Sequence, residues 1–119
     1  INSHTIIENH PDIIPKAQTW ASDKPNVTIV TGSWFDVKDN LSTYDGLFYD
    51  TWGDDNMTNF SASLSTLIKQ GGVATWWNIL SEENNYYNIP NVTYTQHSVN
   101  PPSNSYFNNT TYYLPQCQL

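Results

Sequence analysis

The sequence predicts an α/β fold with a mostly parallel sheet and an antiparallel pair of strands at its end. Two observations lead to this class. Short apolar runs alternate with segments of helical periodicity over the first 78 residues, and two strand-like runs then follow in succession. The chain has 119 residues, which is enough for one domain with its own core. We therefore expect a single domain over residues 1–119.

The first part of the chain predicts a strand, a helix and a second strand. The first strand is the β-branched run His4–Glu8, which ends on an acid. Apolar residues recur at helical spacing over Ile13–Ala21, where Pro15 is tolerated only if it lies in the first turn. Asp23–Asn26 breaks this helix, and Val27–Val30 is the second strand. A short crossover then leads to the next strand.

The middle of the chain predicts a third strand, a longer helix and a fourth strand. Tyr44–Tyr49 has the bulky and aromatic residues of a buried strand. Apolar residues form one helical face over residues 57–68, and Gly71-Gly72 is expected to end this helix because glycine suits the residue after a helix. Val73–Trp77 is the fourth strand. This alternation of strands and helices predicts parallel pairing.

The last part of the chain changes character, because residues 81–109 are rich in Asn, Ser, Tyr and Pro. One strand is expected at Val92–Val99, and a final strand at Thr110–Leu114 is expected to end on Pro115. Two strands in succession predict an antiparallel, hairpin-like pair at the edge of the sheet, joined by a long loop.

Charge and composition narrow the range of partners. Eleven acids against four bases give a net charge of −7, which argues against nucleic acids and anionic membranes and favours a cationic ligand. No apolar stretch approaches the roughly 18 residues of a membrane span, and no signal-peptide pattern is present, so we expect a cytoplasmic protein. The single cysteine, Cys117, shares no metal-ligand spacing with His4, His10 or His97, so no metal site is expected.

Five stretches carry a resemblance to a known family: HTIIENHPD, VTIVTGSWFDV, YDGLFYDTW, LIKQGGVATWWN and YYLPQ. In this order and at these spacings, the chain from His4 to about Gln116 resembles the later part of class I S-adenosyl-L-methionine-dependent methyltransferases. It is most similar to guanidinoacetate N-methyltransferase and the related protein-arginine methyltransferases. The resemblance implies a partial Rossmann-like methyltransferase sheet, S-adenosyl-L-methionine as the cofactor, and a guanidino-type small molecule or an arginine side chain as the methyl acceptor.

The resemblance implies a cofactor site at the ends of the first two strands. Glu8 would accept hydrogen bonds from both ribose hydroxyls, with Asn9 beside it. Gly32, Ser33 and Trp34 would lie against the adenine, where a glycine permits close approach of the backbone. The alternatives are a solvated charge at a strand end for Glu8 and a core aromatic for Trp34.

The resemblance also implies a catalytic, substrate-binding and cofactor-contacting role for Asp50, which matches an aspartate beside the methyl donor in the guanidino-methylating branch. A carboxylate can bind two N–H groups of a guanidinium, align its nitrogen and favour loss of a proton as the methyl group is gained. Asn78, Ile79 and Leu80 would face the substrate. The alternatives are a helix cap for Asp50 and a hydrogen bond to its own turn for Asn78.

Two parts of the family pattern are missing from this sequence: the first strand with its glycine-rich loop, and most of a helix, which is reduced to SEENNYYNI at residues 81–89. In the family order the missing strand lies between the strands that end at Glu8 and Asp50. We therefore expect one of three arrangements. These strands pair directly with each other, or the chain forms homo-oligomers or associates through the exposed sheet edge, or the chain is part of a longer protein.

Two functions follow from these features of the sequence. The first is an incomplete S-adenosyl-L-methionine-dependent N-methyltransferase that acts on a guanidino-type small molecule or an arginine side chain. The alternative is a non-catalytic binding or assembly module that retains part of the methyltransferase fold.

Overall fold

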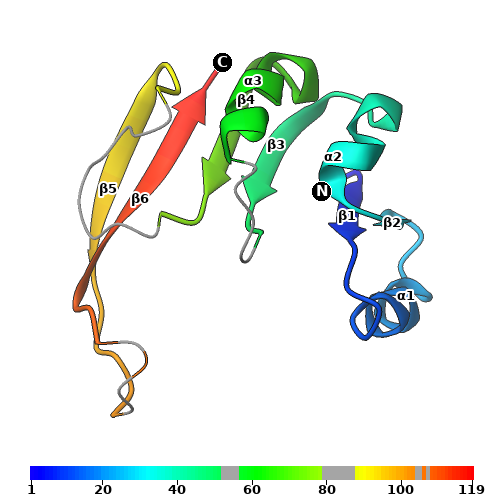
Figure 1. The fold of residues 1–119 in the computed structure, drawn as a ribbon, viewed down its shortest axis with the longest axis horizontal. Helices are drawn as coiled ribbons and strands as arrows, with labels where there is room; N and C mark the ends of the chain where they lie inside the picture. Colours follow the sequence, from blue (N-terminus) through cyan, green and yellow to red (C-terminus); the bar gives the residue numbers. More distant parts are fainter. Residues whose placement is uncertain (52–56, 79–87, 104–105, 107) are drawn as a thin grey trace. The chain divides into compact units, whose positions relative to one another are not determined.

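The computed structural model describes residues 1–51, 57–78, 88–103, 106 and 108–119 (Figure 1). The chain divides into two compact units, Ile1–Leu41 and Ser42–Leu119. The single domain expected over residues 1–119 stays a prediction.

The first unit contains a parallel pair of strands and three helical segments. These are β1 (His4–Glu8), α1 (Ile14–Ala21), β2 (Val27–Thr31), α2 (Trp34–Val37) and the 3-10 helix η1 (Lys38–Asn40). β1 and β2 run parallel, with Ile6 opposite Ile29 and Glu8 opposite Thr31. The predicted strand, helix and strand are confirmed. The short crossover that follows β2 takes the form of α2 and η1.

Local hydrogen bonds explain where α1 begins and ends. Pro15 lies in the first turn, where a missing N–H costs nothing, and the carbonyl of His10 accepts from the amide of Ile14 at 3.0 Å. At the other end, Lys24 donates its ammonium to the carbonyl of Trp20 at 2.7 Å and lies 4.5 Å from the centre of the Trp20 ring. The helix is therefore held at both ends by neighbours in sequence.

The second unit is a four-stranded sheet with one long helix. Its elements are β3 (Tyr44–Tyr49), α3 (Met57–Leu67), β4 (Ile68–Trp76), β5 (Val92–Ser98) and β6 (Thr111–Gln118), and the strand order is β3-β4-β6-β5. β3 and β4 are parallel, whereas β6 is antiparallel to both β4 and β5. Together with the parallel β1–β2 pair, this arrangement confirms a mixed α/β fold with antiparallel terminal strands, as in a partial Rossmann-like methyltransferase sheet (Figure 1).

The core of the second unit forms where α3 packs on β3 and β4. Phe60 of α3 is 0% exposed, and its ring stacks on Tyr49 of β3 with centroids 4.3 Å apart. The same ring meets Trp76 of β4 edge-on at 6.3 Å. Leu64 and Leu67 continue this buried face, as the helical spacing of the apolar residues predicts.

The prediction that Gly71-Gly72 ends the long helix is wrong. The helix ends at Leu67, and β4 begins at once at Ile68 and runs through both glycines. Pairing decides this outcome: the carbonyl of Leu119, the last residue of the chain, accepts from the amide of Gly71, and the amide of Leu119 donates to the carbonyl of Gly72 at 3.0 Å.

The prediction that the last strand ends on Pro115 is also wrong, because β6 continues to Gln118. Pro115 has no N–H, but its carbonyl accepts from the hydroxyl of Thr75 at 2.7 Å, so β4 and β6 stay joined beside it. Beyond it, Cys117 lies opposite Ala74 and is fully buried, and burial raises the pKa of its thiol.

The described strands form two sheets, β1-β2 in the first unit and β3-β4-β6-β5 in the second. In the described part of the chain, β1 pairs with β2 alone, and β3 pairs with β4 alone. The two strands belong to different units, so the alternative that the strands ending at Glu8 and Asp50 pair directly stays a prediction. One edge of β1 and one edge of β3 keep their backbone N–H and C=O groups outside any described ladder.

Candidate functional site

The carboxylate of Glu8 is held in place at the carboxyl end of β1. Its Oε1 accepts from the backbone amide of Asn9 at 2.9 Å and from that of His10 at 2.8 Å. Hydrogen bonds from two amides to one charged oxygen are strong and fix its direction. The other oxygen, Oε2, accepts no hydrogen bond from the residues that the structure describes, so it can receive a ligand hydroxyl.

The turn after β1 is built from its own residues. The amide of Asp12 donates to Nδ1 of His10 at 3.1 Å, so this nitrogen acts as an acceptor within the turn. The side chain of Asn9 is exposed, and its described contact with Glu8 comes from its backbone. This turn therefore serves Glu8 through main-chain groups.

Gly32 connects the ends of the two strands in the first unit. Its amide donates to the carbonyl of Glu8 at 2.9 Å. Its φ is +134°, and a Cβ there would lie 3.1 Å from Cγ1 of Val37. The backbone conformation strongly favours glycine at this position, and the contact with Val37 would be tight for any larger residue.

Ser33 and Trp34 begin the short helix that follows. Ser33 is extended, and its carbonyl accepts from the amides of Asp36 and Val37 at 3.1 Å. Trp34 is buried and meets Phe35 edge-on at 5.8 Å. Burial fits the core-aromatic alternative for Trp34, and the predicted contact of Ser33 and Trp34 with adenine stays a prediction.

In the second unit, Asp50 follows directly after β3 and is exposed. The carbonyl of the preceding Tyr49 accepts from the amide of Trp77 at 3.2 Å, so the ends of β3 and β4 are held side by side. Among the described residues, the carboxylate of Asp50 has no ion pair or hydrogen bond. The predicted catalytic, substrate-binding and cofactor-contacting roles of Asp50 stay predictions.

Asn78 lies one residue beyond Trp77 and is 8% exposed. Its side-chain amide donates to the carbonyl of Tyr113 on β6 at 3.0 Å, and so links the end of β4 to the neighbouring strand. This long-range bond differs from the local turn bond that was the alternative for Asn78. The predicted substrate residues Ile79 and Leu80 lie outside the described residues.

Trp77 is a feature of this strand end that the analysis of the sequence did not select as a site residue. Its side chain is 44% exposed, and its ring contacts Tyr112 of β6 at 5.7 Å. The flat face of an indole can stack on a planar or cationic group, so an exposed tryptophan at this strand end can contribute to binding. The signal in the sequence is the pair of tryptophans at 76 and 77, because successive residues of a strand face opposite sides.

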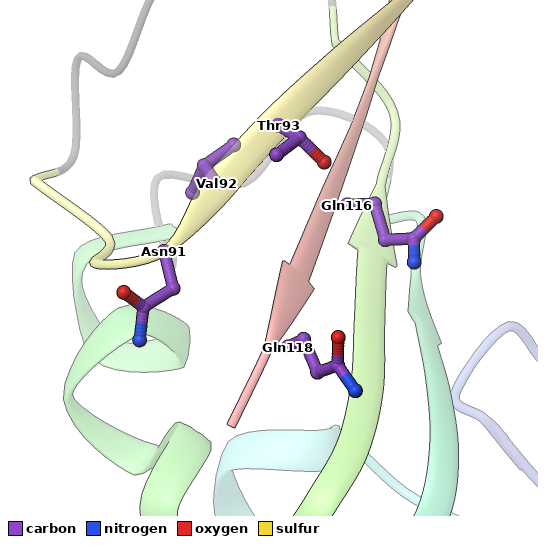
Figure 2. A pocket seen from close by; sticks show the side chains of 5 residues that line it. All are labelled: Asn91, Val92, Thr93, Gln116 and Gln118. Carbon is purple, nitrogen blue, oxygen red and sulfur yellow. The ribbon is translucent and has the colours of Figure 1, made fainter.

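A pocket of about 460 Å³ lies on the antiparallel part of the second unit. Figure 2 shows the side chains that line it, which come from β5, β6 and the residue before β5: Asn91, Val92, Thr93, Gln116 and Gln118. The polar groups of these lining residues are neutral amides and a hydroxyl, which offer hydrogen bonds. None of the residues predicted from the sequence lines it.

No helix in the part of the chain that the structure describes is long and apolar enough to cross a membrane. No three His, Cys, Asp or Glu side chains in the same part of the chain are grouped in a way that could hold a metal ion.

Comparisons with known proteins give consistent results. The family model of guanidinoacetate N-methyltransferase matches residues 1–107. Protein arginine N-methyltransferase 2 of Yarrowia lipolytica is 29% identical over 112 residues, which cover 83% of this chain and 23% of the relative. The protein of the same name from Kluyveromyces lactis is 28% identical over 148 residues, covering 100% of this chain and 36% of the relative. The one from Aspergillus oryzae is 33% identical over 84 residues, covering 63% and 20%.

The chain thus spans about a fifth to a third of the length of these relatives, with 20% at one end and 36% at the other. The family model matches most of the chain, including β1 with Glu8 and β3 with Asp50. The resemblance stated from the sequence is therefore confirmed at the level of the methyltransferase family. With its strand order and its matched residues in agreement, the chain belongs to the guanidinoacetate N-methyltransferase family.

Proposed function

We propose that this chain is part of an S-adenosyl-L-methionine-dependent N-methyltransferase that acts on a guanidino-type small molecule or an arginine side chain. The observation that carries the proposal is the carboxylate of Glu8, which two backbone amides hold at the end of a parallel strand. Carboxyl ends of parallel strands are where α/β proteins bind nucleotide-like ligands.

In the first unit, the described residues fit the nucleoside part of this cofactor. Oε2 of Glu8 is oriented and open, and a carboxylate oxygen can accept hydroxyl donors from a ribose. Gly32 keeps the backbone beside Glu8 free of a side chain, and Ser33 and Trp34 follow it. When bound, the cofactor would supply an electrophilic methyl group on its sulfonium sulfur.

In the second unit, Asp50 is the residue that fits a guanidino substrate. Its carboxylate is exposed and has no charged partner among the described residues. A guanidinium presents N–H groups in a fixed fork, and two of them can bind one carboxylate. Asp50 would orient the nitrogen and accept the proton that this nitrogen loses as its bond to the methyl carbon forms.

Replacing Glu8 by alanine is expected to weaken binding of S-adenosylhomocysteine by about tenfold or more, because charged hydrogen bonds to a ligand are lost. Isothermal titration calorimetry of the whole chain measures this directly. Glu8→Gln, which keeps the size and one acceptor oxygen, is expected to lose affinity while retaining the fold. Asp12→Ala is the matched control, since it removes an exposed acid from the same turn.

Two results would contradict the proposal. One is the absence of saturable heat when the wild-type chain is titrated with millimolar S-adenosylhomocysteine. The other is a Glu8→Ala variant that binds this ligand as tightly as wild type. Unchanged binding by Asp12→Ala is needed to show that the effect belongs to the carboxylate of Glu8 and not to net charge.

The edge of β3 that pairs with no described strand favours a second candidate function, a non-catalytic module that assembles with a second copy of itself. β3 contains neither proline nor lysine, the residues that usually protect an edge, and its one charge, Asp45, is bound by Lys69 at 3.1 Å. Phe48 is 64% exposed, and Gly46 is exposed beside it. In an antiparallel pair of two β3 strands, Phe48 can lie over Gly46 of the second copy.

Phe48→Lys is expected to weaken this self-association by about tenfold or more, because an edge lysine opposes strand pairing. Light scattering over a concentration series measures the mass of the chain in solution. Thr58→Lys adds the same charge on the exposed face of α3 and is expected to leave the association unchanged. A wild-type chain that is monomeric throughout the series, or a Phe48→Lys dimer as stable as wild type, would rule out the module.

A further inference from the structure

The exposed indole of Trp77 lies at the same end of the same strand pair as Asp50. Tyr49 and Trp76 are opposite each other in the β3–β4 ladder, so Asp50 and Trp77 are the next residues on the two chains. The hydrogen bond from the amide of Trp77 to the carbonyl of Tyr49, at 3.2 Å, continues this pairing. Residues opposite each other in a parallel pair have their side chains on the same face of the sheet.

That face is the one turned away from α3. Tyr49 and Trp76 both contact Phe60 of α3, and the residue that follows each of them points to the other side. The ring of Trp77 agrees with this direction, because it contacts Tyr112. Residues two apart in a strand share a face, so Tyr112 of β6 lies on the same side of the sheet as the exposed Leu114.

The charges of the second unit leave Asp50 available for a cation. The unit contains one lysine, Lys69, and its ammonium binds Asp45 at the opposite end of β3. Asp50 therefore has no described cationic partner within the unit. Cations are attracted both by a carboxylate and by the face of an indole ring, and a planar guanidinium can stack on that ring while its edge points to a carboxylate.

We propose that Trp77 is a positioning residue for a guanidinium group: the indole receives the flat face of the cation while Asp50 binds two of its N–H groups. This inference rests on the proposed function, because it names the residue that orients the methyl acceptor. An indole beside the carboxylate would also let the site distinguish a guanidinium from an ammonium, which Asp50 alone does not do. A carboxylate attracts any cation, whereas the indole face favours a planar, weakly hydrated guanidinium over an ammonium.

The test is a titration of the whole chain with methylguanidinium chloride at constant ionic strength, followed through the indole N–H signals in nuclear magnetic resonance spectra. The signal of Trp77 is identified by its loss in Trp77→Phe. Wild type is expected to give a saturable shift of this signal. Methylurea has nearly the same shape without the charge and is expected to give none, and methylammonium is expected to bind more weakly than methylguanidinium.

Trp77→Leu is expected to weaken methylguanidinium binding by about twofold to thirtyfold, which is the range of a cation–π contact. In this variant the binding is followed by calorimetry. Trp77→Phe keeps an aromatic face and is expected to lose less than Trp77→Leu. Asp50→Asn is expected to lose about tenfold. Thermal unfolding of each variant shows whether a loss of binding comes with a loss of structure.

Two results would overturn the inference: Trp77→Leu binding methylguanidinium as tightly as wild type, or methylurea shifting the Trp77 signal as strongly as methylguanidinium. Calorimetry with S-adenosylhomocysteine separates this failure from that of the proposed function. If the cofactor analogue binds and Trp77→Leu has no effect, the positioning role is wrong and the proposed function stands. If the analogue does not bind but methylguanidinium binding depends on Trp77, the methyltransferase proposal fails and the cation site remains.

Discussion

Replacing Phe60 by alanine is expected to lower the free energy of unfolding of the second unit by about 3–5 kcal/mol. Phe60 is 0% exposed and contacts both strands of the parallel pair, Tyr49 of β3 and Trp76 of β4. Its removal leaves a cavity between the helix and the sheet and removes two ring contacts. Urea unfolding followed by circular dichroism measures the loss.

Phe48→Ala, measured at a concentration at which the chain is monomeric, is the matched control, because it makes the same change at a side chain that is 64% exposed. We expect it to alter the free energy of unfolding by no more than about 0.5 kcal/mol. If Phe60→Ala lowers the free energy of unfolding by less than about 1 kcal/mol, the packing of α3 on the sheet is not the main contribution to the core. A cavity of the size of the removed ring would cost far more.

The elements that the sequence predicts correctly are those with a local signal. β3 has the predicted bounds, Tyr44–Tyr49, because an apolar run is enclosed by polar residues on both sides. The buried face of α3 follows the spacing of its apolar residues. Local side-chain chemistry is sufficient in these cases, since the tertiary environment agrees with it.

The elements predicted wrongly are those that long-range pairing decides. Gly71-Gly72 and Pro115 have the local chemistry of a helix end and a strand end. In the structure, Gly71 and Gly72 bond to Leu119, and the carbonyl of Pro115 bonds to Thr75. These contacts join residues 40 or more positions apart, and a pattern within a short window contains no information about them.

The features of the candidate site also fall into those with a local signal in the sequence and those that depend on contacts between distant residues. The position of Glu8 at the end of a strand follows from the apolar run before it, but the two amides that hold its carboxylate depend on the dihedral angles of the turn. The partner of Asn78 is Tyr113, which lies 35 residues away. The role that we propose for Trp77 needs the register of β3 against β4, which the sequence does not supply.

Replacing Gly72 by alanine is expected to lower the free energy of unfolding by about 3 kcal/mol, because a buried site with no room must accept an extra carbon atom. A Cβ at Gly72 would lie 2.6 Å from Cγ2 of Ile68, 2.9 Å from the carbonyl oxygen of Lys69 and 3.0 Å from that of Asp45. Two of these atoms belong to the backbone where β4 begins and where the β3–β4 register shifts. They cannot move away without disturbing the ladder.

Gly46→Ala, in the neighbouring strand, is the control. It tests whether the loss of stability in Gly72→Ala comes from the short distances around Gly72 or would follow from replacing any glycine of these strands. At Gly46 the nearest atom to a Cβ is 4.0 Å away, and φ is not positive. We expect this control to be neutral or to stabilise by up to about 1 kcal/mol, because alanine loses less entropy in a strand than glycine. Urea unfolding of both variants gives the comparison. If Gly72→Ala and Gly46→Ala have the same free energy of unfolding, β4 can bend away from β3. The close approach of Gly72 to Asp45 would then not fix the register of β3 against β4, on which the pairing of Asp50 with Trp77 depends.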